Sequence, residues 1–127
     1  MKIKTIIFSD ANNASFTRLE NVISNAFGSL TSDGSYSTSV YSTVQSGMPE
    51  IAGALRTNNI VVLFADERIY HEAKRSICKA FKFEMIHSVD VLEKLSSMED
   101  HGRYMLHALM PSNATAFALS DGLFPGF

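Results

Sequence analysis

The residues best suited to chemistry follow a short apolar run in the middle of the chain. Residues 60–64 are continuously apolar, which is typical of a central strand buried on both faces of a parallel sheet. Asp66, Glu67 and His71 come just after it. Because ligands in open α/β sheets bind outside the carboxyl ends of the strands, these side chains are candidates for metal binding or acid/base catalysis. The alternative is a solvated turn whose acidic residues stabilise the following helix.

Further candidates for ligand binding lie in three predicted loops. Ser9 and Asp10 follow the first predicted strand, where ligand contact competes with a simple Asx-type turn. Arg68 belongs to the central turn. Near the end of the chain a third turn is a candidate for facing the same crevice, and it consists of Ser120, Asp121 and Gly122. His87, His101 and His107 lack the spacing of metal ligands, so we predict structural roles for them and assign no residue as a metal ligand.

Alternating strand and helix signals surround these loops and must position them. Apolar residues at helical spacing predict helices over residues 15–27, 46–56, 69–81, 88–98 and 101–109. In the helix over residues 69–81 the apolar stripe consists of Ile69, Ala73, Ile77 and Ala80. Apolar runs or alternation predict strands over residues 2–8, 36–42, 60–64, 83–86 and 114–119. The first of these strands is expected to be an inner strand that starts at the surface, and the second a half-exposed strand at an edge of the sheet. The order indicates an α/β fold with three layers, in which a mostly parallel sheet carries helices on both faces. We expect one domain over residues 1–127.

Composition places the chain among ordinary globular proteins. It has 127 residues, 46% of them hydrophobic, and a net charge of -2, so no basic excess indicates nucleic-acid binding. Its apolar runs are far shorter than the roughly 20 residues that span a bilayer, which predicts no membrane partner. The single cysteine, Cys78, is expected in the core. Together these features predict a cytoplasmic protein.

The end of the chain resembles a known family. In HALMPSNATAFALSDGLFPGF, the pair Met110 and Pro111 precedes Ala114, and Gly122 precedes a final Pro-Gly-Phe. This order is similar to that of MoaB/Mog-like molybdopterin-binding domains, in the form found at the N-terminus of CinA (competence-damage-inducible) proteins. IAGALRTNNIVVL and FEMIHSVDVLEKL occur in matching order. The resemblance implies a small phosphate-bearing ligand, either molybdopterin-like or a nucleotide, a linked pyrophosphatase activity, and a dimer or trimer.

The chain departs from this family where the family holds phosphate. The family follows its central strand with a Gly-Gly-x-Gly turn and a Thr-x-Asp-Asp motif, whereas this chain has FADERIYHE. Leu123 and Phe124 replace a Thr-Ala pair, and the family continues into further sheet, which suggests a fragment of a longer protein. An apolar end at Leu123, Phe124 and Phe127 is also suited to a homo-oligomer contact.

Two functions fit these departures. The first is a divergent domain that has lost the phosphate loop and acts as a ligand-binding or structural module. The second is a nucleotide or pterin phosphohydrolase, similar to an ADP-ribose pyrophosphatase, in which Asp66, Glu67 and His71 do the chemistry. We expect no definite cofactor for either, and the ligand that the resemblance implies is molybdopterin-like or a nucleotide.

The missing glycines predict weak binding of phosphates. A carboxylate about 4 Å from a phosphate costs on the order of 4 kcal/mol at an effective dielectric constant of about 20. A hydrogen bond to a charged group recovers only about 1.5 to 3 kcal/mol. Since Asp66 and Glu67 both lie in the turn, we expect pterin phosphates and ADP-ribose to bind no tighter than roughly millimolar.

Overall fold

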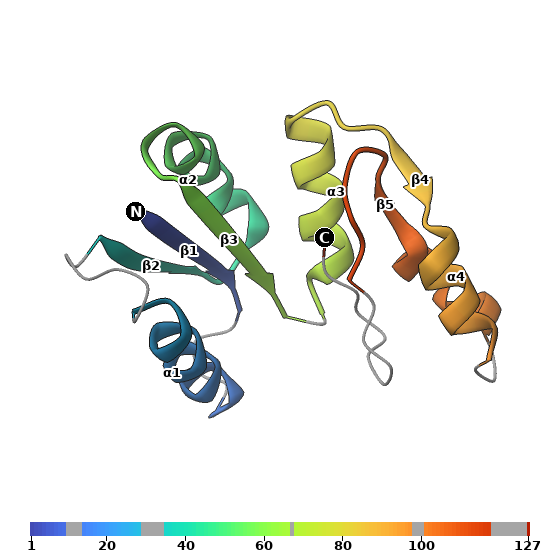
Figure 1. Ribbon diagram of the computed structural model, residues 1–127, viewed down its shortest axis with the longest axis horizontal. Helices are drawn as coiled ribbons and strands as arrows, with labels where there is room; N and C mark the ends of the chain where they lie inside the picture. Colours follow the sequence, from blue (N-terminus) through green and yellow to red (C-terminus); the bar gives the residue numbers. More distant parts are fainter. Residues whose placement is uncertain (10–13, 29–34, 67, 98–100, 118–126) are drawn as a thin grey trace. The chain divides into compact units, whose positions relative to one another are not determined.

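The computed structural model describes residues 1–9, 14–28, 35–66, 68–97, 101–117 and 127 (Figure 1). The chain divides into two compact units, Met1–Ile69 and Tyr70–Phe127. We describe each unit by itself.

The first unit contains a three-stranded parallel sheet. Its elements in chain order are β1 (Ile3–Phe8), α1 (Ala14–Gly28), β2 (Tyr36–Tyr41), α2 (Val44–Thr57) and β3 (Ile60–Ala65). The strand order is β2-β1-β3, and Ile3 lies opposite both Tyr36 and Ile60. The predicted α/β class is therefore confirmed for this unit, and so is the prediction of an edge position for β2.

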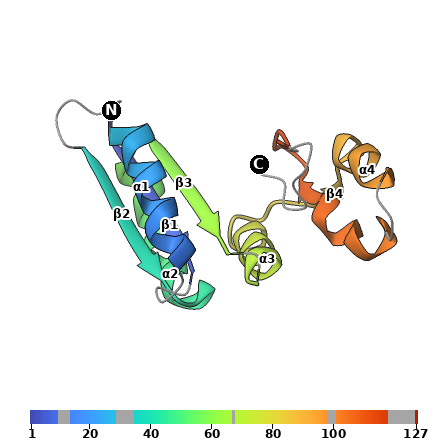
Figure 2. The same ribbon diagram turned by 90° about the horizontal axis from the view of Figure 1, so that it is seen from below.

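Helices cover both faces of this sheet. The chain moves in one direction from β1 to β2 and in the opposite direction from β2 to β3. Because each parallel crossover is right-handed, the reversal places α1 and α2 on opposite faces, as Figures 1 and 2 show. The first unit thus has the three layers expected from the sequence.

The central strand is β1, and the prediction that residues 60–64 form it was wrong. Five side chains of β1 are fully buried, namely Ile3, Thr5, Ile6, Ile7 and Phe8. By contrast β3 lies at an edge of the sheet, Ile60 is 40% exposed, and the rest of the strand is only partly buried. An apolar run records burial but does not specify which strands lie beside it, and the sequence predicted β1 only as an inner strand that starts at the surface.

A polar network allows Lys4 to lie within the central strand. Its Nζ lies 2.9 Å from Glu50 Oε1 and donates to Ser39 Oγ at 2.7 Å. Ser39 and the Tyr41 hydroxyl also donate to the Glu50 carboxylate. Burial opposes ionisation of Glu50, but the hydrogen bonds from Tyr41, Lys4 and Ser39 outweigh it and lower its pKa. The network joins α2 to β1 and β2.

The second unit pairs helices with a two-stranded antiparallel sheet. Its elements are α3 (Tyr70–Ala80), β4 (Met85–His87), α4 (Val89–Ser96), the 3-10 helix η1 (His101–Ala108) and β5 (Leu109–Pro111). Met85 pairs with Pro111, and His87 pairs with Leu109. A small core forms from Val91, Leu95, Ala108 and Met110. The helices and the strand predicted at residues 83–86 are present with shifted bounds. Among the described residues, no strand after β3 joins the parallel sheet, so the prediction of one mostly parallel sheet holds only for the first unit.

The prediction of a strand over residues 114–119 was wrong in its described part. Residues 114–117 contain a bend and a single bridge residue, Phe117, which is 64% exposed. Residues 118 and 119 lie outside the described residues. The strand instead comes earlier, as β5, where Pro111 ends the pairing and Ser112 N-H donates to Glu84 O at 2.8 Å. The apolar residues of this short segment led to a wrong prediction, because no described strand pairs with it.

Two glycines of α2 provide a matched test of this packing. A Cβ at Gly47 would lie 2.5 Å from Phe8 Cε1 and 2.7 Å from Tyr41 Cδ2, whereas a Cβ at Gly53 would meet nothing within 4 Å. We expect Gly47→Ala to lower the free energy of unfolding by about 1 to 3 kcal/mol through overpacking. Gly53→Ala should raise it by about 0.5 to 1 kcal/mol, because alanine favours the helix. Urea unfolding measures both, and equal effects would contradict the packing of α2 on β1 and β2.

Candidate functional site

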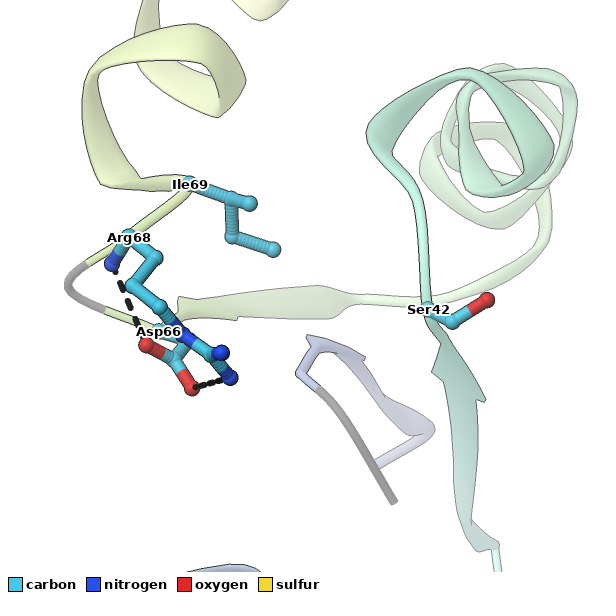
Figure 3. A pocket seen from close by; sticks show the side chains of 4 residues that line it. All are labelled: Ser42, Asp66, Arg68 and Ile69. Atoms are coloured by element: carbon cyan, nitrogen blue, oxygen red, sulfur yellow. Dashed lines mark hydrogen bonds and ion pairs between the residues drawn. The ribbon is translucent and has the colours of Figure 1, made fainter. Parts of the chain in front are cut away.

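Polar side chains gather where the three parallel strands of the first unit end. Ser9 follows β1, Ser42 follows β2 and Asp66 follows β3. The chain runs from β1 to its neighbour β2 and then crosses back to β3, on the other side of β1. The β1/β3 pair is therefore a topological switch point, the place where doubly wound sheets bind ligands. An open hollow of about 350 Å³ lies at this edge, lined by Ser42, Asp66, Arg68 and Ile69 (Figure 3).

Backbone hydrogen bonds hold the strand ends in place. Ser9 N-H donates to Tyr41 O at 3.0 Å, and Asp66 N-H donates to Phe8 O at 2.9 Å. These bonds continue the ladder of the sheet one residue past each strand. Ser9 is only 7% exposed, and its hydroxyl donates to Asp66, which lines the hollow.

Asp66 connects other residues of the site through hydrogen bonds. Its Oδ1 accepts the Arg68 backbone N-H at 3.1 Å, and its Oδ2 accepts the Ser9 hydroxyl at 3.4 Å. Its carbonyl oxygen accepts the Ile69 N-H at 3.0 Å. This is an Asx-type turn in which the side chain replaces a backbone acceptor. A turn therefore follows β3, and Asp66 binds the backbone of that turn.

The same contacts keep Asp66 ionised. The Arg68 backbone N-H is the largest influence and lowers the pKa of Asp66, burial opposes it, and the Arg68 guanidinium and the Ser9 hydroxyl lower the pKa further. Arg68 Nη2 lies 3.5 Å from Asp66 Oδ2, but the Arg68 side chain is 68% exposed. An exposed ion pair of this kind is worth only about 0 to 1 kcal/mol, so a ligand can draw the guanidinium away from Asp66 at little cost.

The arrangement is equipped for binding rather than for proton transfer. An ionised carboxylate accepts about four hydrogen bonds, and a guanidinium carries about five donors in a planar fork. Asp66 is a weak general base at neutral pH because its pKa is lowered. Among the described residues, no group of three His, Cys, Asp or Glu side chains is placed to hold a metal ion.

The structure brings together three of the residues predicted from the sequence. Ser9, Asp66 and Arg68 meet at the edge of the sheet. The remaining ligand-binding and catalytic candidates of the first unit and the chain end lie outside the described residues, namely Asp10, Glu67, Ser120, Asp121 and Gly122. Sequence reasoning missed Ser42, although the rule applied to the other strand ends would have found it, since Ser42 follows β2 directly.

His71, the third predicted catalytic residue, belongs to the second unit. Its ring lies edge-on to the His107 ring at a centroid distance of 4.6 Å and to the Tyr70 ring at 5.2 Å. Burial lowers the pKa of His71, and the nearby charges of His107, Lys74 and Arg75 lower it further. His71 is therefore a neutral imidazole at pH 7 within an aromatic and basic cluster.

Lys74 is the most buried cation of that cluster. It is 3% exposed, its Nζ donates to Leu106 O at 3.0 Å, and the same Nζ lies 4.8 Å from the centroid of the Tyr70 ring. Burial lowers the pKa of Lys74 to about 8 and raises the pKa of Tyr70 to about 12. The helical stripe predicted for α3 missed this lysine.

The inward face of α3 is shifted from the predicted one. The stripe predicted Ala80 inside, but Ala80 is exposed, whereas Lys74 and Cys78 are buried beside Ala73 and Ile77. Cys78 is 1% exposed, which confirms its predicted place in the core. A side chain as long as lysine can carry its ammonium group to a backbone carbonyl, and spacing rules treat it as a surface residue.

Comparisons with known proteins do not assign this chain to a family. No family model matches this chain, and neither curated proteins nor solved structures give a match. None of the helices in the described part of the chain is long and apolar enough to cross a membrane. The first unit is a small doubly wound α/β unit with an ionised carboxylate and an exposed guanidinium at its switch point.

Burial of Lys74 predicts a pH dependence of stability. The folded pKa of about 8 lies below the ordinary value of 10.5, so the unfolded chain binds more protons between these values and stability rises with pH. Burial raises the pKa of Cys78 above its ordinary value of 9.0 and the pKa of Tyr70 above 10.0, so these two groups oppose the trend only above about pH 9. We therefore expect the free energy of unfolding to rise from pH 8 to pH 9, and Lys74→Met to remove most of that rise. Denaturant unfolding at both pH values measures it, and an unchanged slope in the variant would contradict the burial of the ammonium group.

Proposed function

We propose that this protein is a small-molecule-binding module of a divergent CinA N-terminal, MoaB/Mog-like type, without the ancestral catalytic chemistry. The observation that carries the proposal is the convergence of Ser9 and Asp66, which are 57 residues apart, with Arg68 beside one open hollow. The fold places this hollow at the switch point, where α/β sheets bind ligands.

The chemistry of the first unit favours binding over hydrolysis. Residues 1–69 contain neither histidine nor cysteine, so the hollow has no imidazole or thiol of its own unit to act as base or nucleophile. Asp66 is held in its ionised form by three donors. An anchored carboxylate of this kind positions a ligand, and its lowered pKa makes it a poor proton acceptor.

The three described amides of the turn are not free for a phosphate. A phosphate cradle needs several backbone N-H groups aimed at one point. Here Asp66 N-H donates to Phe8 O, Arg68 N-H donates to Asp66 Oδ1, and Ile69 N-H donates to Asp66 O. Since these amides are used within the protein, the site supports the expectation that phosphate ligands bind weakly.

Binding experiments separate the two functions considered from the sequence. Calorimetry with a pterin phosphate, ADP-ribose, Mg²⁺ and Mn²⁺ should show no affinity tighter than roughly millimolar. A hydrolysis assay with ADP-ribose and either metal should show no turnover above that of Asp66→Asn, a variant that keeps an acceptor for the Arg68 amide.

Two results would contradict the proposal. Metal-dependent hydrolysis that is lost in Asp66→Asn would show a phosphohydrolase, and micromolar affinity for ADP-ribose would show that a phosphate site survives. As a control, Arg56→Gln removes an exposed arginine from the far end of α2, so it should leave every measurement unchanged.

A further inference from the structure

The charges in the hollow define the class of ligand, and this inference rests on the proposed function. We propose that the hollow recognises a small zwitterion that carries an ammonium group and a carboxylate close together, as amino acids do. The ammonium group lies against Asp66 and the carboxylate lies against Arg68.

Asp66 requires a ligand group that donates hydrogen bonds. Its two oxygens accept the Arg68 amide, the Ser9 hydroxyl and the Arg68 guanidinium. An ionised carboxylate has about four acceptor positions, so at least one remains for a ligand. Because the guanidinium contact is long, at 3.5 Å, a compact ammonium group can also take its place.

Arg68 requires a ligand group that accepts hydrogen bonds. Its side chain folds back toward Asp66 along the rim of the hollow (Figure 3), and 68% of it is exposed. The planar fork of a guanidinium matches a carboxylate with two parallel hydrogen bonds. Arg68 can form this pair while its backbone N-H stays on Asp66 Oδ1, so the turn does not have to open.

The balance of charge favours a zwitterion over a simple ion. One carboxylate and one guanidinium lie side by side at the hollow. A lone anion gains Arg68 but is repelled by Asp66, and a lone cation gains Asp66 but is repelled by Arg68. A phosphate dianion meets the strongest repulsion. Only a ligand with both charges satisfies the two side chains together, with Ser42 and Ile69 completing the wall.

The test compares glycine with acetate and methylammonium, each of which carries one of the two charged groups of glycine. Amide chemical shifts of the full chain are followed by NMR during titration with glycine, acetate, methylammonium and inorganic phosphate. We expect glycine to shift the amides of Ser9, Ser42, Asp66 and Arg68 with an affinity in the millimolar range. Acetate, methylammonium and phosphate should each bind at least about tenfold more weakly, because each lacks one charge-assisted contact or adds repulsion.

Two variants and a control locate the binding. Asp66→Asn preserves an acceptor for the Arg68 amide, and Arg68→Gln preserves the backbone of the turn, so both should fold and each should weaken glycine binding at least about tenfold. Arg56→Gln should not change it. Acetate or phosphate binding as tightly as glycine would overturn the inference, and so would glycine binding that both variants leave intact.

The outcomes also separate this inference from the proposed function. If ADP-ribose or a pterin shifts the amides of the hollow with an affinity no tighter than roughly millimolar and glycine does not, the ligand class is wrong and the binding module stands. If no compound shifts those amides, both are overturned.

Discussion

The position of β1 between two parallel neighbours is the constraint on which the first unit depends. Its backbone groups bond to β2 on one side and to β3 on the other, and its fully buried side chains supply much of the core. Because the chain reverses its direction of winding at this strand, the helices cover opposite faces and the ends of β1 and β3 meet at an open crevice. The location of the site follows from strand order before any side chain is considered.

Local hydrogen bonding then decides what the crevice can recognise. The amides of Asp66, Arg68 and Ile69 donate to Phe8 and to Asp66 itself, so the carboxylate and guanidinium side chains are the groups from which we argue the ligand class. A glycine-rich loop would offer backbone N-H groups and suit phosphates. The Asx turn after β3 is the reason why we propose a ligand that carries its own donors.

Much of this arrangement could be predicted from the sequence, and the failures have physical causes. Helical spacing predicted α1 to α4, and the rule for strand ends predicted the meeting of Ser9, Asp66 and Arg68. Strand neighbours could not be predicted, because hydrophobicity measures burial and not pairing, and Lys4 reaches its partner on α2 only in the folded state. Likewise Lys74 is buried because Leu106, far along the chain, supplies an acceptor, which no local pattern records.

Amide hydrogen exchange of Ser9 and Asp66 tests the central claim most directly, because the Ser9 N-H donates to Tyr41 O at the end of β2 and the Asp66 N-H donates to Phe8 O at the end of β1. The strand order β2-β1-β3 predicts that both amides exchange as slowly as the interior amides of β1, such as those of Ile6 and Ile7. If β1 is protected while the Ser9 and Asp66 amides exchange at the rate of an unfolded chain, the strand ends do not meet and the site as described does not form.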